Sequence, residues 1–404
     1  MYFPWFVARK LTTGGGNSLA ASILKMATAV VALCLAAMLV SVCIAKGFRN
    51  EIENKLMGFS GHIQITRVAN LDNENAEGVA CDDTIFNFIR KDPAVKSVQP
   101  YIFSPGIIKA GDLIEGIRFK GIDSSFDTSF ISNHLLQGRF INTHNKTLNE
   151  TVISTTTAQR LGLKVGDALR VYFVGSELKG RKFNIVGIYE TGLEDFDKTF
   201  AWCGIWVLQK LNGRDSNAAD GMEVMLKDIK LISSKTESIH TALPPDMNAE
   251  SIRETFPELM DWLDLVGQNV YIVLALMLAV AVISMITSIL VLMIERTAMI
   301  GVFKSFGASN FTLTHVFMML AGKLALFGLF WGNLIAFGFI IAQQKLHLIT
   351  LPQESYYMKY VPVQIDWTLA IGINIGTLIV CIVFMLLPSL IINRISPLAA
   401  LRFK

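Results

Sequence analysis

The sequence has few charged residues, few cysteines and little net charge. Charged residues make up 17% of its 404 positions, and the formal net charge is only +3. A nearly neutral chain lacks the basic surface that nucleic-acid binding needs, so we expect no nucleic-acid partner. Three of the five cysteines, Cys34, Cys43 and Cys381, lie in apolar stretches. The other two, Cys81 and Cys203, show no spacing typical of a disulfide framework, and a single bond between them stays open.

Motifs of catalysis and metal binding are also missing. No Lys-Ser or Lys-Thr completes a phosphate-binding loop after the glycine-rich stretch at 14–18 or elsewhere. The six histidines form neither a His-x-His nor a His-Glu-x-x-His spacing, and no Gly-x-Ser-x-Gly elbow is present. We therefore predict no catalytic residue, no metal site and no cofactor bound by this chain.

Long apolar runs dominate what is present. Hydrophobic residues make up 52% of the chain, and the mean hydropathy is +0.46. Four runs, at 22–45, 270–294, 315–342 and 367–392, are each long enough to cross a hydrocarbon core of about 30 Å as a helix. The first run is longer than the apolar part of a signal peptide, and no cleavage site follows it. We therefore predict four transmembrane helices.

Basic residues near the ends of these runs predict the orientation. Lys and Arg lie before the first run, in the loop after the second and behind the fourth, whereas the loop at 343–366 has only Lys345 and Lys359. Short loops rich in Lys and Arg stay in the cytoplasm. We therefore expect the interfacial helix at 1–21, the loop at 295–314 and the tail at 393–404 inside the cell. Residues 46–269 and the loop at 343–366 then lie outside.

Lys323 is the only charged residue within the four runs away from their ends. An unpaired lysine at such a depth costs roughly 2.5–3.5 kcal/mol on insertion scales. We expect its side chain to snorkel to the surface or to contact a polar residue such as Asn333. An ion-coupled transporter would need an acidic partner in these runs, and the sequence has none.

The segment at 46–269 predicts a mixed α/β domain. Helical spacing of apolar residues continues from the first run to Phe59, so this helix should extend beyond the membrane. Residues 62–68 alternate like a strand, and residues 151–174 read as strand, helix, turn and strand. Both ends of the domain are attached to membrane helices, and motion of those helices must therefore move it.

The loop at 295–314 predicts a short amphipathic helix. Its apolar residues fall at helical spacing, while Glu295, Arg296 and Lys304 form a polar face. Gly307 should end this helix, and Ser309 or Asn310 should cap the next one. The apolar face should be buried against lipid headgroups or against a protein partner, and these alternatives stay open. Its members are Ala298, Met299, Val302, Phe303 and Phe306.

The motifs together resemble a known family along nearly the whole chain. The segments that carry the resemblance are GFRNEIENKLMGFSGHI at 47–63, VISTTTAQRLGLKVGDALRVYF at 152–173, FNIVGIYETG at 183–192, LVLMIERTAMIGVFKSFGAS at 290–309, FGLFWGN at 327–333, LPQESYYMKYVPVQIDW at 351–367 and ISPLAALR at 395–402. In this order they resemble the membrane subunits of bacterial lipoprotein-releasing ABC transporters, the Lol type of the FtsX/MacB-like permeases.

The resemblance implies a location in the bacterial inner membrane and a MacB-like periplasmic domain. That domain would have a porter part (about 46–115 and 218–262) and an inserted part (about 116–217). Residues 295–309 would be the coupling helix, seated in a separate cytoplasmic ATPase that binds ATP and Mg. The implied coupling residues are Glu295, Arg296, Met299, Ile300, Gly301, Val302, Phe303, Lys304, Phe306 and Gly307.

The resemblance also implies a triacylated lipoprotein as substrate and a second permease subunit, either a paralogue or a second copy. The first two spans of the two subunits would form an apolar cavity for the acyl chains. Its candidate lining is Leu39, Val42, Ala45, Phe48, Ile52, Val270, Val273 and Leu274. A soluble periplasmic lipoprotein carrier would contact the loop at 175–181, through Ser176, Glu177, Leu178, Lys179 and Arg181. This loop is short. Either the loop that grips the carrier is abbreviated in this chain, or the subunit mainly handles the substrate.

Two other functions stay open. A related FtsX/MacB-type permease would drive efflux or transmit force to a periplasmic partner, but the efflux type usually carries a fused ATPase. A membrane-anchored periplasmic enzyme is disfavoured, because no catalytic motif is present and because the helix at 295–309 faces the cytoplasm.

Overall fold

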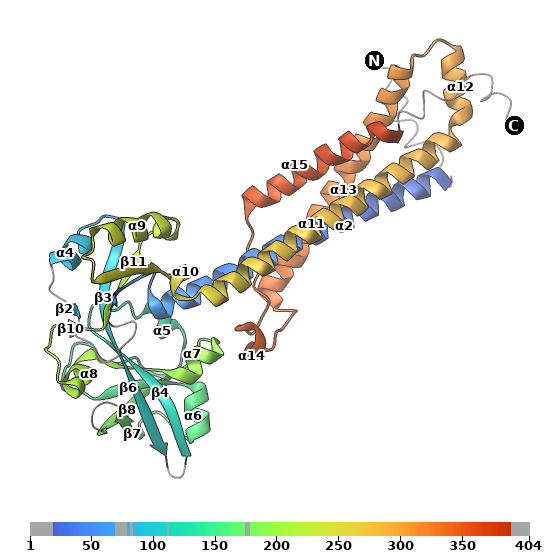
Figure 1. The fold of residues 1–404 in the computed structure, drawn as a ribbon. Coiled ribbons are helices and arrows are strands. Elements are labelled where there is room, and N and C mark those ends of the chain that lie inside the picture. The colour runs from blue at the N-terminus through green and yellow to red at the C-terminus, as the bar shows by residue number, and fades with distance from the viewer. Residues whose placement is uncertain (1–18, 69–78, 81–83, 111–112, 174–177, 389–404) are drawn as a thin grey trace. The chain divides into compact units, whose positions relative to one another are not determined.

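The protein is described by a computed structural model that covers residues 19–68, 79–80, 84–110, 113–173 and 178–388. The chain divides into two compact units (Figure 1). Unit 1 comprises Met1–Arg49, Trp262–Thr350 and Tyr360–Lys404, and unit 2 comprises Asn50–Asp261 and Leu351–Lys359.

Four long apolar helices confirm the predicted membrane spans. Among the described residues, four helices are long and apolar enough to cross a membrane. The longest has 42 residues, or about 63 Å at 1.5 Å per residue, and therefore extends well beyond a bilayer core. The prediction that the first helix continues beyond its apolar run as far as Phe59 is confirmed. The four are α2 (Leu19–Ser60), α11 (Pro257–Glu295), α13 (Asn310–Leu346) and α15 (Trp367–Phe384).

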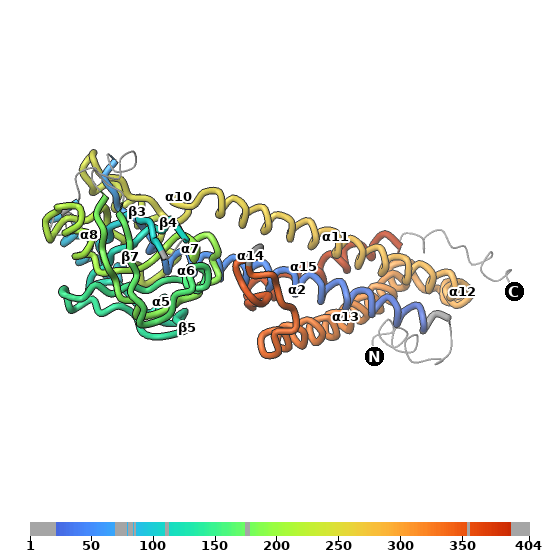
Figure 2. The backbone as a smooth tube through the Cα atoms, turned by 90° about the horizontal axis from the view of Figure 1, so that it is seen from below, coloured from blue at the N-terminus to red at the C-terminus, as the bar shows by residue number. Residues whose placement is uncertain are grey.

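Small and amide side chains set the packing of the helices in unit 1. Gly328 and Gly332 of α13 lie against α2, where an added Cβ at Gly332 would come within 2.8 Å of the Ala32 carbonyl oxygen. Figure 2 shows α13 running beside α2. Paired glycines four residues apart allow this close approach of helices in membranes. The Asn333 and Asn374 amides exchange hydrogen bonds of 2.7 and 3.1 Å between α13 and α15. Asn333 is thus paired with Asn374, and Lys323 is exposed on α13. The expectation that the Lys323 side chain snorkels to the surface or contacts a polar residue stays a prediction.

Unit 2 is built on a ten-stranded sheet. The strand order is β12-β1-β11-β3-β4-β9-β6-β8-β5, and β7 pairs with β3 and β8 (Figure 1). A further two-stranded sheet joins β2 (Val79–Ala80) and β10 (Ala218–Ala219). The main sheet contains β1 (Ile63–Arg67), β3 (Val95–Ala110), β4 (Leu113–Ile122), β5 (Leu135–Gly138), β6 (Glu150–Ser154), β7 (Ala168–Phe173), β8 (Lys179–Tyr189), β9 (Phe200–Gly204), β11 (Gly221–Leu226) and β12 (Met247–Ser251).

The mixed α/β prediction for this segment is confirmed. The predicted strand, helix, turn and strand are β6, α6 (Thr155–Leu161) and β7, and Ser154 caps α6 by accepting a hydrogen bond from the Thr157 backbone. The other helical segments of unit 2 are α4 (Thr84–Arg90), α5 (Ser129–Asn133), α7 (Glu194–Thr199), α8 (Ile205–Asn212), η1 (Ile229–Leu231), α9 (Ile232–Ala242), α10 (Ile252–Thr255) and α14 (Gln353–Tyr356).

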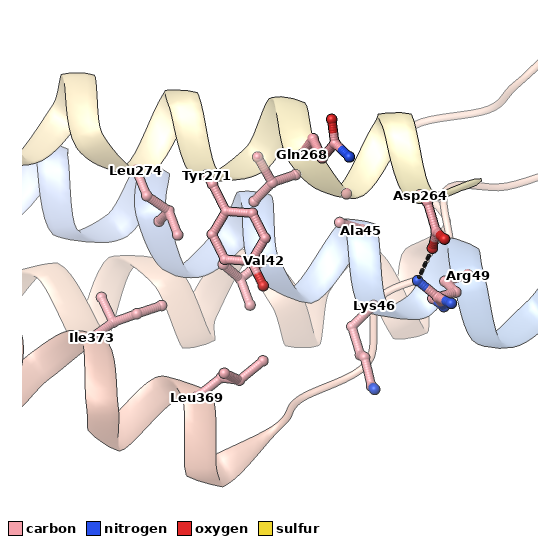
Figure 3. Close-up of a pocket in the computed structure, with 12 residues that line it drawn as sticks. Val42, Ala45, Lys46, Arg49, Asp264, Gln268, Tyr271, Leu274, Leu369 and Ile373 are labelled. Carbon is pink, nitrogen blue, oxygen red and sulfur yellow. Dashed lines mark hydrogen bonds and ion pairs between the residues drawn. The ribbon is translucent and has the colours of Figure 1, made fainter. Parts of the chain in front are cut away.

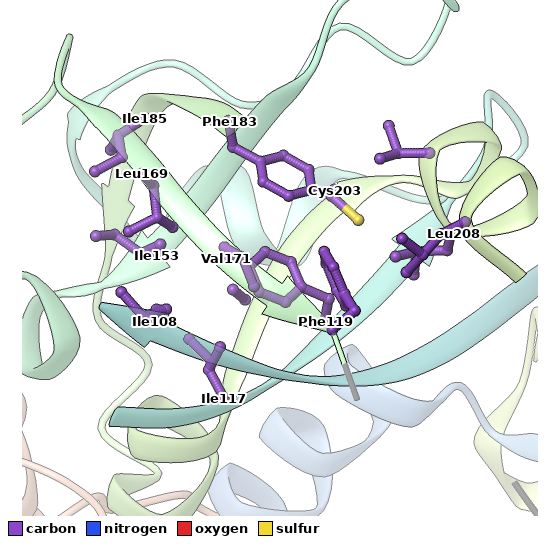
Figure 4. Packing of buried hydrophobic residues seen from close by; sticks show 14 of the residues in the cluster. Ile108, Ile117, Phe119, Ile153, Leu169, Val171, Phe183, Ile185, Cys203 and Leu208 are labelled. Atoms are coloured by element: carbon purple, nitrogen blue, oxygen red, sulfur yellow. The ribbon is translucent and has the colours of Figure 1, made fainter. Parts of the chain in front are cut away.

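Two separate apolar cores stabilise unit 2. One packs residues of β3, β4 and β6–β9 with α6 and α8 around Phe119 and Phe183, whose rings stack at 5.2 Å (Figure 4). The other lies between β1, β3, β11 and β12 and the helices α4 and α9. The first core contains Cys203 as a free, fully buried cysteine, whereas Cys81 lies outside the described residues. The division into a porter part and an inserted part stays a prediction.

A buried lysine holds the end of α2 within unit 2. Lys120 of β4 donates to the carbonyl oxygen of Phe59, one of the last carbonyls of α2, and its ammonium lies 2.6 Å from a Glu223 carboxylate oxygen. Both side chains are at most 2% exposed. Burial lowers the pKa of Lys120 and raises the pKa of Glu223, while their ion pair opposes both shifts. The Lys120 ammonium also lies within 6 Å of the rings of Tyr101, Phe103, Phe126 and Trp202.

Candidate functional site

An apolar groove in unit 1 is formed by three membrane helices. Its volume is about 490 Å³. Val42 and Ala45 of α2 face residues of α11, and Tyr271 points from α11 toward α2 (Figure 3). The helix α15 closes a third side with Leu369 and Ile373. The α11 residues are Gly267, Gln268, Val270, Tyr271 and Leu274, with Asp264 at one end.

One end of the groove is polar. The Arg49 guanidinium donates to a carboxylate oxygen of Asp264 at 2.7 Å and so links α2 to α11 (Figure 3). Phe48 and Trp262 pack edge to face beside this ion pair, with ring centroids 5.6 Å apart. Lys46 also lines this end. The site therefore combines an apolar wall with charged and amide groups at one mouth.

The structure brings four of the eight proposed cavity residues together, namely Val42, Ala45, Val270 and Leu274. Leu39 is 2% exposed and packs among the membrane helices instead. Phe48 is buried against Trp262, and Ile52 is fully buried in unit 2. Val273 is 37% exposed on α11 but does not line the groove.

Several residues of the groove were not predicted from the sequence. Tyr271 is 72% exposed and lines the groove, although it lies between two predicted residues on α11. Leu369 and Ile373 come from α15 and follow Tyr271 by about a hundred positions in the chain. A helical stripe shows which residues share a face, but it does not show which distant helix will cover that face.

The chemistry of the groove suits an aliphatic ligand with a polar end. Transfer of an alkyl chain from water into apolar surroundings is favourable by about 0.8 kcal/mol per CH₂. The groove volume lies within the usual range of ligand sites, which are mostly apolar with a few placed polar groups. An alkyl chain can therefore lie along the wall while its polar end meets Lys46, Gln268 or the Arg49–Asp264 pair.

The second candidate site is the short helix α12 (Thr297–Ser305), which follows Glu295 and Arg296 and connects α11 to α13. The expected turn chemistry is confirmed: Gly307 has a φ of 87°, and the Ser309 side chain accepts a hydrogen bond from the Thr312 backbone. Ile300 and Gly301 are buried. Glu295, Val302, Phe306 and Gly307 are exposed, and the remaining predicted coupling residues, Arg296, Met299, Phe303 and Lys304, are half-buried.

The predicted apolar stripe of α12 therefore divides into two faces. Phe303 packs beside Val316 and Met319 of α13 within unit 1. Phe306 is 85% exposed and, with Val302 and Ala298, forms the outer face. Docking of this outer face into an ATPase stays a prediction.

The proposed carrier-contact loop is described only in part. Ser176 and Glu177 lie outside the described residues. Leu178, which directly precedes β8, is 68% exposed. Lys179 donates to the Leu211 carbonyl oxygen at 2.9 Å, and Arg181 donates to the neighbouring Gly180 carbonyl oxygen at 3.1 Å. Carrier contact by this loop stays a prediction.

The described parts of the chain contain no group of three His, Cys, Asp or Glu side chains that could hold a metal ion. The candidate sites are thus the apolar groove and the exposed face of α12, and their described residues do not bring together the nucleophile and base of an enzyme site.

Two family models match this chain. The family model of the MacB-like periplasmic core domain matches residues 26–242, and that of the FtsX-like permease C-terminal region matches residues 271–397. The periplasmic region of MacB from Actinobacillus actinomycetemcomitans, a solved structure, aligns with a TM-score of 0.37 and 14% identity over 49% of this chain and 92% of that chain.

Curated relatives align along nearly the whole chain. The lipoprotein-releasing system transmembrane protein LolC of Neisseria meningitidis serogroup B is 21% identical over 99% of each chain. LolC of Xylella fastidiosa (strain Temecula1) is 22% identical over 93% of this chain and 92% of its own. LolE of Haemophilus influenzae is 19% identical over 98% of each chain.

These relatives are permease subunits of ABC transporters, and the four apolar helices with the MacB-like domain make this chain a multi-pass inner membrane protein. The chain belongs to the family that carries the MacB-like periplasmic core domain, and with its FtsX-like C-terminal region it is a Lol-type ABC transporter permease.

Proposed function

We propose that the chain is the transmembrane subunit of an ATP-driven transporter that extracts lipoproteins from the outer leaflet of the inner membrane for delivery to the outer membrane. The observation that carries this proposal is the groove, because an apolar wall within the membrane helices meets a polar mouth at Arg49 and Asp264. The names of the LolC and LolE relatives support a lipoprotein as substrate. In this proposal both termini and α12 face the cytoplasm, and unit 2 lies in the periplasm.

The groove would protect acyl chains from water as they leave the bilayer. Exposure of one chain of about fifteen CH₂ groups to water would cost roughly 12 kcal/mol. A volume of about 490 Å³ is too small for three such chains. A second permease subunit, a paralogue or another copy, would therefore complete the cavity by placing its own helices against the open side.

The outer face of α12 would insert into a cytoplasmic ATPase. We expect Phe306→Ala to weaken binding of that ATPase by roughly 3 kcal/mol, because a ring buried in a partner's pocket contributes about this much. The binding constant can be measured with the purified membrane chain in nanodiscs. Phe330→Ala is the matched control, since Phe330 is 63% exposed on the membrane part of α13. Equal affinity of the two variants would mean that α12 lies on lipid.

The proposed function is tested by reconstitution. We expect the rigorously purified chain to hydrolyse no ATP, because it has no phosphate-binding loop, and to support hydrolysis once its ATPase partner is added. With the second permease and a triacylated lipoprotein in proteoliposomes, ATP should release the lipoprotein to a soluble acceptor. Transport of a small drug in place of lipoprotein would support the efflux alternative and contradict the proposal.

A further inference from the structure

The connection between α13 and α15 is fixed at its base. Two backbone hydrogen bonds join the outgoing and returning chain at this base. The Val361 N–H donates to the Ile349 carbonyl oxygen at 3.2 Å, and the Leu351 N–H donates to the Lys359 carbonyl oxygen at 3.0 Å. Gln343, 1% exposed near the end of α13, donates to the carbonyl oxygens of Ile349 and Val361 and accepts from the Ile349 backbone at 2.9 Å. The segment Leu351–Lys359, here called the strap, therefore leaves α13 from a rigid base.

The strap itself belongs to unit 2, and one carboxylate holds both of its ends. Gln353 donates to Oε1 of Glu190 at 3.0 Å, and Lys359 donates to Oε2 of the same side chain at 2.9 Å. Burial alone would raise the pKa of Glu190, but the hydrogen bonds from Lys359 and Gln353 outweigh it and hold this pKa below its usual value. Glu190 directly follows β8 and thus connects the strap to the main sheet.

A second set of contacts ties the middle of the strap to α2. The Lys55 ammonium, on the part of α2 within unit 2, donates to the Tyr357 carbonyl oxygen at 2.7 Å. Gly192 lies beneath this contact with a φ of 82°, and a Cβ there would meet Gln353, Tyr357 and Lys55 atoms at 3.1–3.2 Å. Loops between helices are usually more mobile than the elements they connect. The strap is instead held at Gln353, Tyr357 and Lys359.

We propose that the strap is a mechanical link that transmits motion of α13 to the sheet of unit 2 through Glu190, in addition to the two covalent connections α2 and α11. Only the turn at 306–309 separates α12 from α13, so a displacement imposed on α12 reaches the base of the strap through this turn and the one continuous helix α13. The hydrogen bonds at the base of the strap and those from Gln353 and Lys359 to Glu190 then transmit the displacement to the end of β8. The assumption that an ATPase drives this motion rests on the proposed function. The contacts between Glu190 and the strap do not depend on it.

The link is tested with Glu190→Lys in the complex with the ATPase, by hydrogen–deuterium exchange with and without a non-hydrolysable ATP analogue. In the wild type we expect the analogue to change exchange in α12, α13 and residues 186–193. In Glu190→Lys, amides of the strap should exchange at least about tenfold faster without nucleotide, and the response at 186–193 should disappear while the response in α12 remains. Adding Lys359→Glu to the same chain should restore both, because it recreates the ion pair with reversed charges.

Glu237→Lys is the matched control, because it makes the same charge change at an exposed position of α9. A nucleotide response at 186–193 that persists in Glu190→Lys would overturn the link, and so would unchanged exchange of the strap. Lipoprotein release is measured separately on the same complexes. A wild-type complex that shows the nucleotide response but releases no lipoprotein would contradict the proposed function and leave the link supported.

Discussion

Replacing Val42 with aspartate should stop lipoprotein release while leaving assembly with the ATPase intact. Val42 lies in the wall of the groove between α2 and α11. A charged side chain at such a position costs roughly 2.5–3.5 kcal/mol when acyl chains replace water around it. If this cost enters the rate-limiting transfer, release should fall by about 50-fold or more. The release rate from proteoliposomes and the amount of co-purified ATPase are the two measurements.

The matched control is Val280→Asp. Val280 lies on α11, is 41% exposed, and is not part of the groove. The same charge is therefore introduced into a membrane helix without touching the proposed acyl path. Release should stay within a few-fold of the wild type in this variant. Normal release by Val42→Asp, or equal loss in both variants, would remove the groove from the lipid path.

The second large effect is expected in unit 2, where Lys120→Met should lower the free energy of unfolding by about 3–5 kcal/mol. The substitution leaves the Glu223 carboxylate buried without its cation and takes the donor from the Phe59 carbonyl. For a unit of this size the midpoint of thermal unfolding should fall by roughly 10 °C. This shift in the midpoint is measured by thermal unfolding of the full chain in detergent, monitored by tryptophan fluorescence.

Two further variants distinguish the contribution of the Lys120–Glu223 ion pair from that of the packing of the Lys120 side chain. Lys120→Met combined with Glu223→Met should recover most of the loss, because two apolar side chains leave no unpaired charge. Recovery should stay incomplete, since the Phe59 carbonyl still lacks its donor. Lys182→Met, at an exposed position of β8, should change the midpoint little. A Lys120→Met variant as stable as the wild type would show that the buried pair does not hold the end of α2.

Local sequence patterns were sufficient for the membrane helices and for much of unit 2. Uninterrupted apolar runs require a helix because a bilayer offers the backbone no other hydrogen-bond partner. The β6–α6–β7 order followed from alternation, then helical spacing, then alternation. The turn at Gly307 and the cap at Ser309 were also predicted correctly, because each depends on a single residue type at a helix end.

Contacts between distant residues could not be predicted in this way. Lys120 and Glu223 are separated by 103 positions, and nothing near either residue indicates a buried partner. The sequence indicated only a short loop in the region of the strap. The contacts that hold the strap involve Glu190, which lies more than 160 positions earlier in the chain, so local patterns could not indicate them. The two faces of α12 were read as one apolar stripe, since only α13 determines that Phe303 turns inward while Phe306 stays exposed.

The most direct test of the account is site-specific photo-crosslinking in the assembled transporter without nucleotide. A photoreactive residue at Val42 or Leu274, both in the groove, should capture the acyl chains of a lipoprotein. The same residue at Ile379, which is 55% exposed on α15 and outside the groove, should capture bulk lipid but little lipoprotein. Addition of ATP should reduce capture at the two groove positions. Equal capture of lipoprotein at all three positions, with or without ATP, would contradict the claim that this groove carries the substrate.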